Sequence, residues 1–288
     1  MRLLAFEKGG FPALGLRRGD EFIDLSEAAP DLPSHMPGLL GAGDAAKDRL
    51  SALLENPPAN AVRALDGITY CPPVWNAGKI ICVGLNYEDH AAETKLDKPD
   101  YPILFLRVAT TLVGHEQPLV VPKASEQLDY EAEMVVVIGS KGRNIAREKA
   151  LELVAGYSVF NEGSVRDFQF KSQPWTSGKN FDASGGFGPE LVTADEVPPG
   201  GQGLKIRTRL NGETLQDGNT KDMMFKVPEL IRVISEVMTL EPGDIIVSGT
   251  PPGVGFVRTP PIFMGAGDTC EIEVEGIGLL RNPIIAEQ

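Results

Sequence analysis

Two glutamates stand two residues apart at the start of an apolar run. Glu131 and Glu133 directly precede residues 134–139, whose β-branched composition predicts a buried strand. Because side chains alternate along a strand, both carboxylates should point to the same face. Neighbouring like charges on a half-buried face repel each other and cost desolvation free energy. A divalent cation would offset both penalties, and carboxylate oxygens suit Mg²⁺, Mn²⁺ or Ca²⁺. The alternative is that both glutamates lie on a solvated strand end.

Histidine is scarce, and one of the three stands near a glutamate at helical spacing. The chain has His35, His90 and His115, and Glu93 follows His90 by three residues within an expected short helix. That spacing places both side chains on one helix face. A carboxylate beside an imidazole stabilises the imidazolium and orients the ring, which would make His90 a general base for water. The alternative is a surface His–Glu pair.

A third cluster follows an expected strand at residues 157–160. Glu162 could add a third metal ligand at the strand end, and Arg166 with Gln169 could form an anion clamp because they share a helix face. Lys179 follows a glycine and could join them, although most lysines are simply exposed.

A glycine- and proline-rich loop at residues 248–255 follows another expected strand. It lacks the Lys-Ser/Thr of a phosphate-binding loop, so we expect no nucleotide site there. The loop could present Thr250 and backbone N–H groups to a small carboxylate, or it could be only a turn.

The surrounding pattern predicts a mixed α+β, β-rich protein without the regular βα alternation of a doubly wound fold. Pro72-Pro73 marks an expected boundary between a small N-terminal domain, residues 1–72, and a catalytic domain, residues 73–288. Further elements are expected from apolar periodicity and from the Asn211-Gly212 hairpin signal. The expected strands are 2–7, 13–17, 21–25, 79–83, 103–107, 206–210, 244–247 and 270–274, and the expected helices are 44–54, 146–155 and 227–238.

The composition of the chain argues against nucleic acid and membranes as binding partners. The chain has 288 residues, 42% of them hydrophobic, and a formal net charge of -13, which disfavours nucleic acid. No apolar stretch approaches the roughly 18 residues of a membrane helix, so no membrane partner is expected. The early charges at the N-terminus do not suit a signal peptide, and three well-separated cysteines fit a reducing compartment. We therefore expect a cytoplasmic protein.

Taken together, these residues resemble the fumarylacetoacetate hydrolase family over roughly residues 75–288. The shared motifs are Gly84-Leu85-Asn86-Tyr87-x-Asp89-His90-x-x-Glu93, Asp129-Tyr130-Glu131-x-Glu133, Gly156-Tyr157 through Arg166-Asp167, Gly178-Lys179 and Gly249-Thr250-Pro251-x-Gly253-Val254-Gly255. The resemblance implies a β-roll catalytic domain preceded by a small α/β domain, and a homodimer. It also implies Mg²⁺ or Mn²⁺ as cofactor and a small anionic 2-oxo or 2,4-dioxo acid as substrate.

By that resemblance, Glu131 and Glu133 match two metal ligands. The third ligand of the family is usually an aspartate, and Glu162 stands at its position. Glutamate keeps the charge but reaches one methylene further, which displaces the metal or the strand end by about an ångström, enough to matter for catalysis.

The resemblance also implies roles for the other candidates. His90 and Glu93 match a water-activating pair on a lid, and Thr250 matches a residue near the substrate carboxylate. The residues that match groups holding the developing oxyanion or the substrate carboxylate are Arg166, Gln169 and Lys179.

We expect from these roles a metal-dependent hydrolase that cleaves the C–C bond of an acylpyruvate-type 2,4-dioxo acid, releasing pyruvate and a carboxylic acid. The alternatives are a hydratase or isomerase of 2-oxo-alkenedioates and a decarboxylase of oxaloacetate-like acids. A non-catalytic binder of the same fold is a further alternative, which only Glu162 favours.

Overall fold

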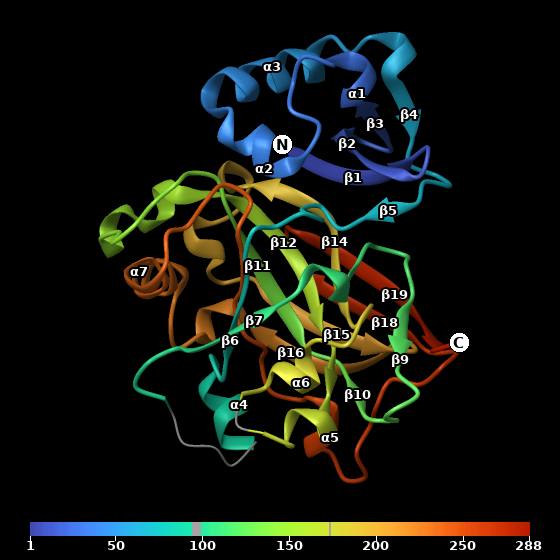
Figure 1. Cartoon of the computed structure of the whole chain (residues 1–288), viewed down its shortest axis with the longest axis vertical. Coiled ribbons are helices and arrows are strands. Elements are labelled where there is room, and N and C mark those ends of the chain that lie inside the picture. Colours follow the sequence, from blue (N-terminus) through green and yellow to red (C-terminus); the bar gives the residue numbers. More distant parts are fainter. Residues whose placement is uncertain (94–98, 173) are drawn as a thin grey trace.

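A twelve-stranded, largely antiparallel sheet forms the centre of the computed structural model, which describes residues 1–93, 99–172 and 174–288, without the side chains of residues 90–92 (Figure 1). Two short strands pair off its main path, β5 (Tyr70–Cys71) with β1 and β8 (Leu112–Val113) with β14. The main path runs in the order β4 (Val62–Ala64), β3 (Glu21–Asp24), β2 (Phe11–Arg18), β1 (Arg2–Lys8), β14 (Gly185–Thr193), β12 (Val154–Glu162), β11 (Ala132–Ile138), β17 (Ile245–Val247), β6 (Ile80–Gly84) and β7 (Ile103–Arg107).

A second sheet of five strands packs against the first. Its order is β16 (Glu213–Asn219), β15 (Lys205–Leu210), β18 (Thr269–Val274), β19 (Gly278–Ala286) and β9 (Leu119–Val121). Asn211 and Gly212 join β15 to β16 with φ values of 52° and 83°, the left-handed conformation that a two-residue hairpin turn requires. A separate pair joins β10 (Leu128–Asp129) to β13 (Ser164–Val165).

Six of the α-helices in the described part of the chain lie at two ends of the molecule, and α7 lies between these ends (Figure 1). In Figure 1 the first three lie with β1–β5 at one end, and α4, α5 and α6 lie at the other. Their bounds are α1 (Leu25–Ala28), α2 (Met36–Gly41), α3 (Gly43–Glu55), α4 (Glu88–Glu93), α5 (Arg166–Gln169), α6 (Thr176–Lys179) and α7 (Val227–Val237). The expected mixed α+β, β-rich class is confirmed.

The expected helix at 146–155 is wrong in kind and in extent. The chain forms a 3₁₀ helix over Arg147–Leu153 and then enters β12 at Val154. The backbone N–H of Gly139, just after β11, donates to the carbonyl of Leu153 (2.7 Å). Pairing with β11 therefore ends the helical turn at Leu153, although local apolar periodicity predicts that the helix continues.

The strand β11 is buried on both faces. Met134, Val136 and Ile138 belong to the core shared with α7 and the five-stranded sheet, whereas Val135 and Val137 belong to the core shared with α2 and α3. Burial on both faces explains why the sequence here is a continuous apolar run instead of an alternating one.

The N-terminal strands extend the central sheet. β1 pairs antiparallel with β14, and β5 returns to pair with β1 just before the expected domain boundary at residues 72 and 73. The N-terminal strands and the strands that follow them therefore form one continuous hydrogen-bonded sheet.

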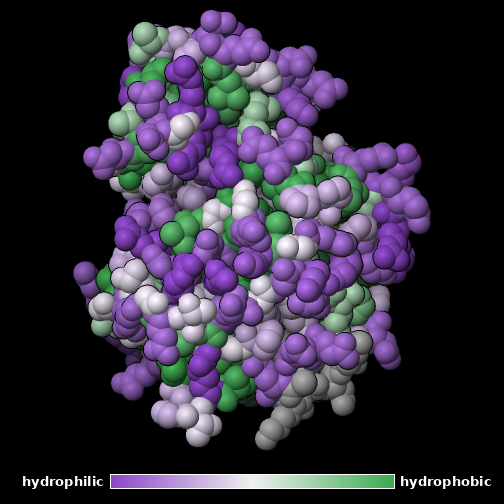
Figure 2. All heavy atoms as spheres, turned by 180° about the vertical axis from the view of Figure 1, so that it is seen from behind, coloured by the Kyte–Doolittle hydropathy of each residue, from purple (hydrophilic) through white to green (hydrophobic). Residues whose placement is uncertain are grey.

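Polar side chains dominate the opposite face of the molecule. Figure 2 shows hydrophobic side chains there only as scattered patches. Across the described residues, we find no helix with both the length and the apolar character needed to cross a membrane.

The packing of α7 against the core can be tested by mutation. Ile234 is fully buried and Val237 is 57% exposed on the same helix. We expect Ile234→Ala to lower the free energy of unfolding in urea by about 2–5 kcal/mol, because it leaves a cavity, and Val237→Ala to change it by less than about 0.5 kcal/mol. Equal losses in both variants would contradict the described orientation of α7.

Candidate metal centre

Three buried glutamates converge where two interior strands of the central sheet, β11 and β12, begin and end. One carboxylate oxygen from each of Glu131, Glu133 and Glu162 lies within 4.8 Å of the other two. The register explains the convergence, because the backbone N–H of Glu162 donates to the carbonyl of Glu131 (2.9 Å), which makes the two residues neighbours across the strands. Glu133 lies two residues along β11 and so points to the same face. The solvated strand end that the sequence left open does not occur.

Lys179 lies inside this cluster. Its Nζ is 2.7 Å from Oε2 of Glu131 and 2.9 Å from Oε2 of Glu162, and its side chain is almost fully buried. Gly178 makes this position possible, since a Cβ there would lie 2.4 Å from the backbone nitrogen of Gln169. The glycine lets α6 approach α5 closely enough for the lysine to reach the carboxylates.

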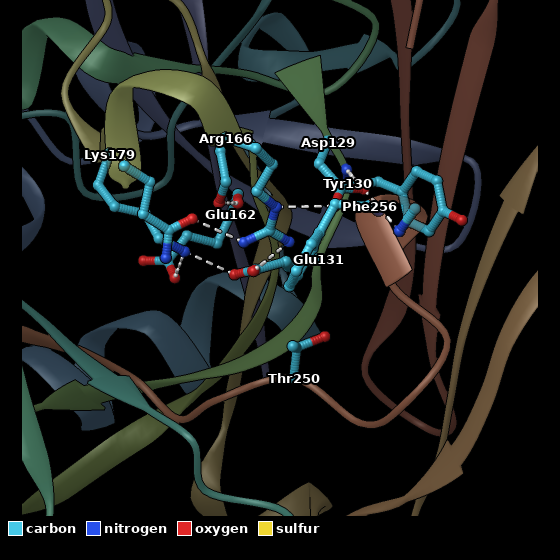
Figure 3. Close-up of polar contacts among 12 residues, drawn as sticks. Asp129, Tyr130, Glu131, Glu162, Arg166, Lys179, Thr250 and Phe256 are labelled. Atoms are coloured by element: carbon cyan, nitrogen blue, oxygen red, sulfur yellow. Dashed lines mark hydrogen bonds and ion pairs between the residues drawn. The ribbon is translucent and has the colours of Figure 1, made fainter. Parts of the chain in front are cut away.

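Arg166 connects the cluster to a fourth buried carboxylate (Figure 3). Its Nη2 is 2.7 Å from Glu131 and its Nε donates to Asp129 (2.8 Å). Its Nη1 donates to Oε1 of Gln169 (2.8 Å), as the shared helix face predicts, and the guanidinium carbon lies 4.4 Å from the ring centre of Phe256. The arginine is therefore held on every side in one orientation.

Asp129 fixes the glycine-rich loop beside the glutamates. Its carboxylate accepts the backbone N–H groups of Gly255 (2.8 Å) and Phe256 (3.0 Å) in addition to the guanidinium of Arg166. Burial raises the pKa of this carboxyl group, and the charge of Arg166 opposes the rise. In the sequence, Asp129 stands out only as the first residue of a shared motif, which predicts no role for it.

The electrostatic balance of the cluster favours a divalent cation. Burial raises the pKa of Glu133 well above its ordinary value, and the charges of Glu162 and Glu131 raise it further. Among the described side chains, this cluster contains four buried carboxylates and two buried cations, Lys179 and Arg166, whose formal charges sum to -2. Oε1 of Glu162 is buried and has no hydrogen-bond partner among the described residues. These oxygen donors fit a hard cation such as Mg²⁺ or Mn²⁺.

A cavity of about 480 Å³ opens onto the three glutamates. Lys179, Arg166, Gln169 and Thr250 line its polar part. Its other lining residues include three aromatic side chains, Phe170, Trp175 and Phe256. The cavity thus joins a charged end to an apolar wall, as sites for small organic acids require.

Helix α4 contacts the glycine-rich loop at residues 248–255 through Glu93. Both carboxylate oxygens of Glu93 accept the backbone N–H of Gly253, at 2.9 and 3.1 Å. His90 belongs to α4, but its side chain lies outside the described residues, so the expected pairing of His90 with Glu93 stays a prediction.

Thr250 is buried and accepts a hydrogen bond from Gln216 (2.9 Å). Sequence reasoning missed Gln216 altogether, because its only local signal is a position in a β-hairpin.

Comparison with known proteins agrees with this geometry. The family model described as fumarylacetoacetate (FAA) hydrolase C-terminal matches residues 79–285. Mitochondrial oxaloacetate tautomerases of Xenopus laevis and Homo sapiens are each 39% identical to the chain, covering 99% of it and 90% and 92% of their own lengths.

Two of the solved structures that resemble the chain cover all of it and are covered by it completely. Fumarylacetoacetate hydrolase from Exiguobacterium antarcticum is 32% identical with a TM-score of 0.85, and maleylpyruvate hydrolase from a Sphingobium species, in complex with manganese(II) and pyruvate, is 28% identical with a TM-score of 0.83. The chain belongs to the fumarylacetoacetate hydrolase family.

Proposed function

We propose that this protein is a divalent-metal-dependent enzyme that interconverts the keto and enol forms of a short 2-oxo acid of the oxaloacetate type. The buried cluster of three glutamates around Lys179 is the observation that carries the proposal. The 39% identity to oxaloacetate tautomerases across nearly the full chain supports tautomerisation over the hydrolysis expected from the sequence.

The chemistry requires that negative charge be stabilised on the 2-oxo oxygen. Removal of a proton from the carbon next to the oxo group leaves an enolate, whose charge resides largely on that oxygen. A divalent cation held by Glu131, Glu133 and Glu162 would supply a Lewis acid for this oxygen. Lys179 adds a positive charge at the same end of the cavity, where burial strengthens electrostatic interactions.

We assign recognition of the substrate carboxylate to Arg166, Gln169 and Thr250. Figure 3 shows Thr250 across the carboxylate of Glu131 from Arg166. The guanidinium and the hydroxyl would then approach a bound acid from two sides and keep its oxo group over the glutamates.

We assign the proton transfer to His90, and to Glu93 the task of anchoring its helix. The two hydrogen bonds from Gly253 tie Glu93 to the loop that carries Thr250. Docking of α4 and placement of the carboxylate-binding hydroxyl would therefore depend on one another. The homodimer implied by the family resemblance is the assembly we propose for the enzyme.

Hydrolysis of an acylpyruvate remains a second candidate because of the cavity. Its volume of about 480 Å³ and its aromatic wall exceed what a four-carbon acid fills, and they offer room for a distal acyl group. The leaving group of that reaction is a pyruvate enolate, which the same charged end would stabilise.

Loss of one proposed ligand should weaken metal binding. We expect the wild-type protein to bind Mn²⁺ in titration calorimetry and Glu162→Gln to bind it at least about tenfold more weakly, since even indirect partners of a metal contribute that much. Glu213→Gln, on an exposed residue of β16, serves as control and should bind as the wild type does. Equal affinity of all three proteins would argue against the site.

Removal of the buried ammonium should slow enolisation. We expect Lys179→Met to retain Mn²⁺ binding but to lower kcat for ketonisation of enol-oxaloacetate, followed by ultraviolet absorbance, by about 10²–10³-fold, the usual cost of losing one oxyanion donor. Lys149→Met, on an exposed lysine paired with Glu152, should match the wild type. A near-normal kcat for Lys179→Met would refute the oxyanion role.

The two candidate reactions separate in one assay. We expect the Mn²⁺-loaded enzyme to accelerate ketonisation of enol-oxaloacetate and to release little pyruvate from acylpyruvates of increasing chain length. Substantial metal-dependent pyruvate release, with no effect on oxaloacetate, would reverse the assignment in favour of the hydrolase.

A further inference from the structure

A single buried amide joins the metal-ligand strand to the loop that carries Thr250. Gln216 lies in β16 and is 1% exposed. Its Oε1 accepts the backbone N–H of Ala132 (2.9 Å) and the hydroxyl of Thr208 (2.6 Å). Its Nε2 donates to Oγ1 of Thr250 (2.9 Å) and to the carbonyl of Pro251 (2.8 Å). The amide makes four hydrogen bonds, which is its full capacity.

The orientation of this amide follows from its backbone partners. The N–H of Ala132 can only donate and the carbonyl of Pro251 can only accept. A flipped amide would place its NH₂ against the first and its oxygen against the second, leaving two buried repulsive contacts. The Nε2 of Gln216 must therefore face Thr250.

This orientation determines what the Thr250 hydroxyl can do. Since Oγ1 accepts the Nε2–H of Gln216, the hydroxyl hydrogen is directed to another acceptor. Among the described residues, which do not include the side chains of residues 90–92, we find no hydrogen bond that this hydroxyl donates. Thr250 lines the cavity at the glutamate cluster, so the hydrogen is available to an acceptor bound there. Accepting one hydrogen bond also strengthens the one that a hydroxyl donates.

We propose that Gln216 is a positioning residue that makes Thr250 a hydrogen-bond donor to the carboxylate of the bound 2-oxo acid. The inference rests on the proposed function and extends it to a residue outside the cavity lining. Ala132 stands between Glu131 and Glu133, so the same amide holds the carboxylate-binding hydroxyl in register with the strand that carries two proposed metal ligands.

An isosteric substitution reverses the hydrogen-bond polarity. In Gln216→Glu, an ionised carboxylate would still accept from Ala132 but would also accept the Thr250 hydroxyl hydrogen, leaving a lone pair facing the substrate carboxylate. We expect pyruvate to bind the Mn²⁺-saturated variant at least about tenfold more weakly than the wild type in calorimetry, the cost of a lost hydrogen bond to a charged group. The KM for enol-oxaloacetate should rise more than kcat falls, and Mn²⁺ affinity should not decrease.

A double-mutant cycle separates polarity from charge and from structural damage. Thr250→Val removes the hydroxyl, so Gln216→Glu should lose most of its effect on pyruvate affinity in that background. Thr250→Ser keeps the hydroxyl and should keep the effect. Gln216→Met, an uncharged variant, should also weaken pyruvate binding, and it provides the test if the glutamate variant does not fold.

The outcomes distinguish the inference from the proposed function. Equal effects of Gln216→Glu in the threonine and valine backgrounds, or unchanged pyruvate affinity in both Gln216 variants, would overturn the positioning role while leaving the proposed function intact. Failure of the wild-type protein to bind pyruvate in the presence of Mn²⁺ would overturn the proposed function, and the inference with it.

Discussion

Mutual repulsion among three buried carboxylates is the constraint on which the rest of the site depends. Strand register brings Glu131, Glu133 and Glu162 within 4.8 Å, in surroundings where charge is poorly solvated. Two buried cations offset part of this cost, and Lys179 and Arg166 each contact the cluster directly. Such crowding persists only where a rigid scaffold imposes it, because flexible strand ends would let the charges separate. The double burial of β11 provides that rigidity.

Close backbone approaches set the geometry around the cluster. A side chain at position 178 would collide with α5, and a Cβ at Gly255 would lie 1.8 Å from the carbonyl oxygen of Ile262 and 2.6 Å from Asp129. Glycine at both places allows α6 and the 248–255 loop to press against the strands. Asp129 then accepts backbone N–H groups of this loop, and these hydrogen bonds fix its carboxylate in one orientation.

Sequence patterns predicted the parts of the structure that depend on neighbouring residues. Strand alternation placed Glu131 and Glu133 on one face, and helical spacing placed Arg166 beside Gln169. The burial of Lys179 and the contacts of Gln216 were beyond reach, because their partners lie tens of residues away and meet only through tertiary packing. The same cause made the helix at 146–155 wrong. The type of reaction could not be predicted from the sequence either. Enolisation and C–C hydrolysis would both rely on the same charged end of the cavity.

The pairing of β1 with β14 has a consequence for colloidal behaviour. Residues Arg2–Leu4 occupy the hydrogen-bonding edge of Glu190–Val192, in the middle of the chain's largest sheet. Without the leading segment, that edge would present unpaired amide and carbonyl groups beside apolar side chains, a template on which a neighbouring molecule could add a strand. Because the leading segment occupies this edge, another molecule cannot add a strand there.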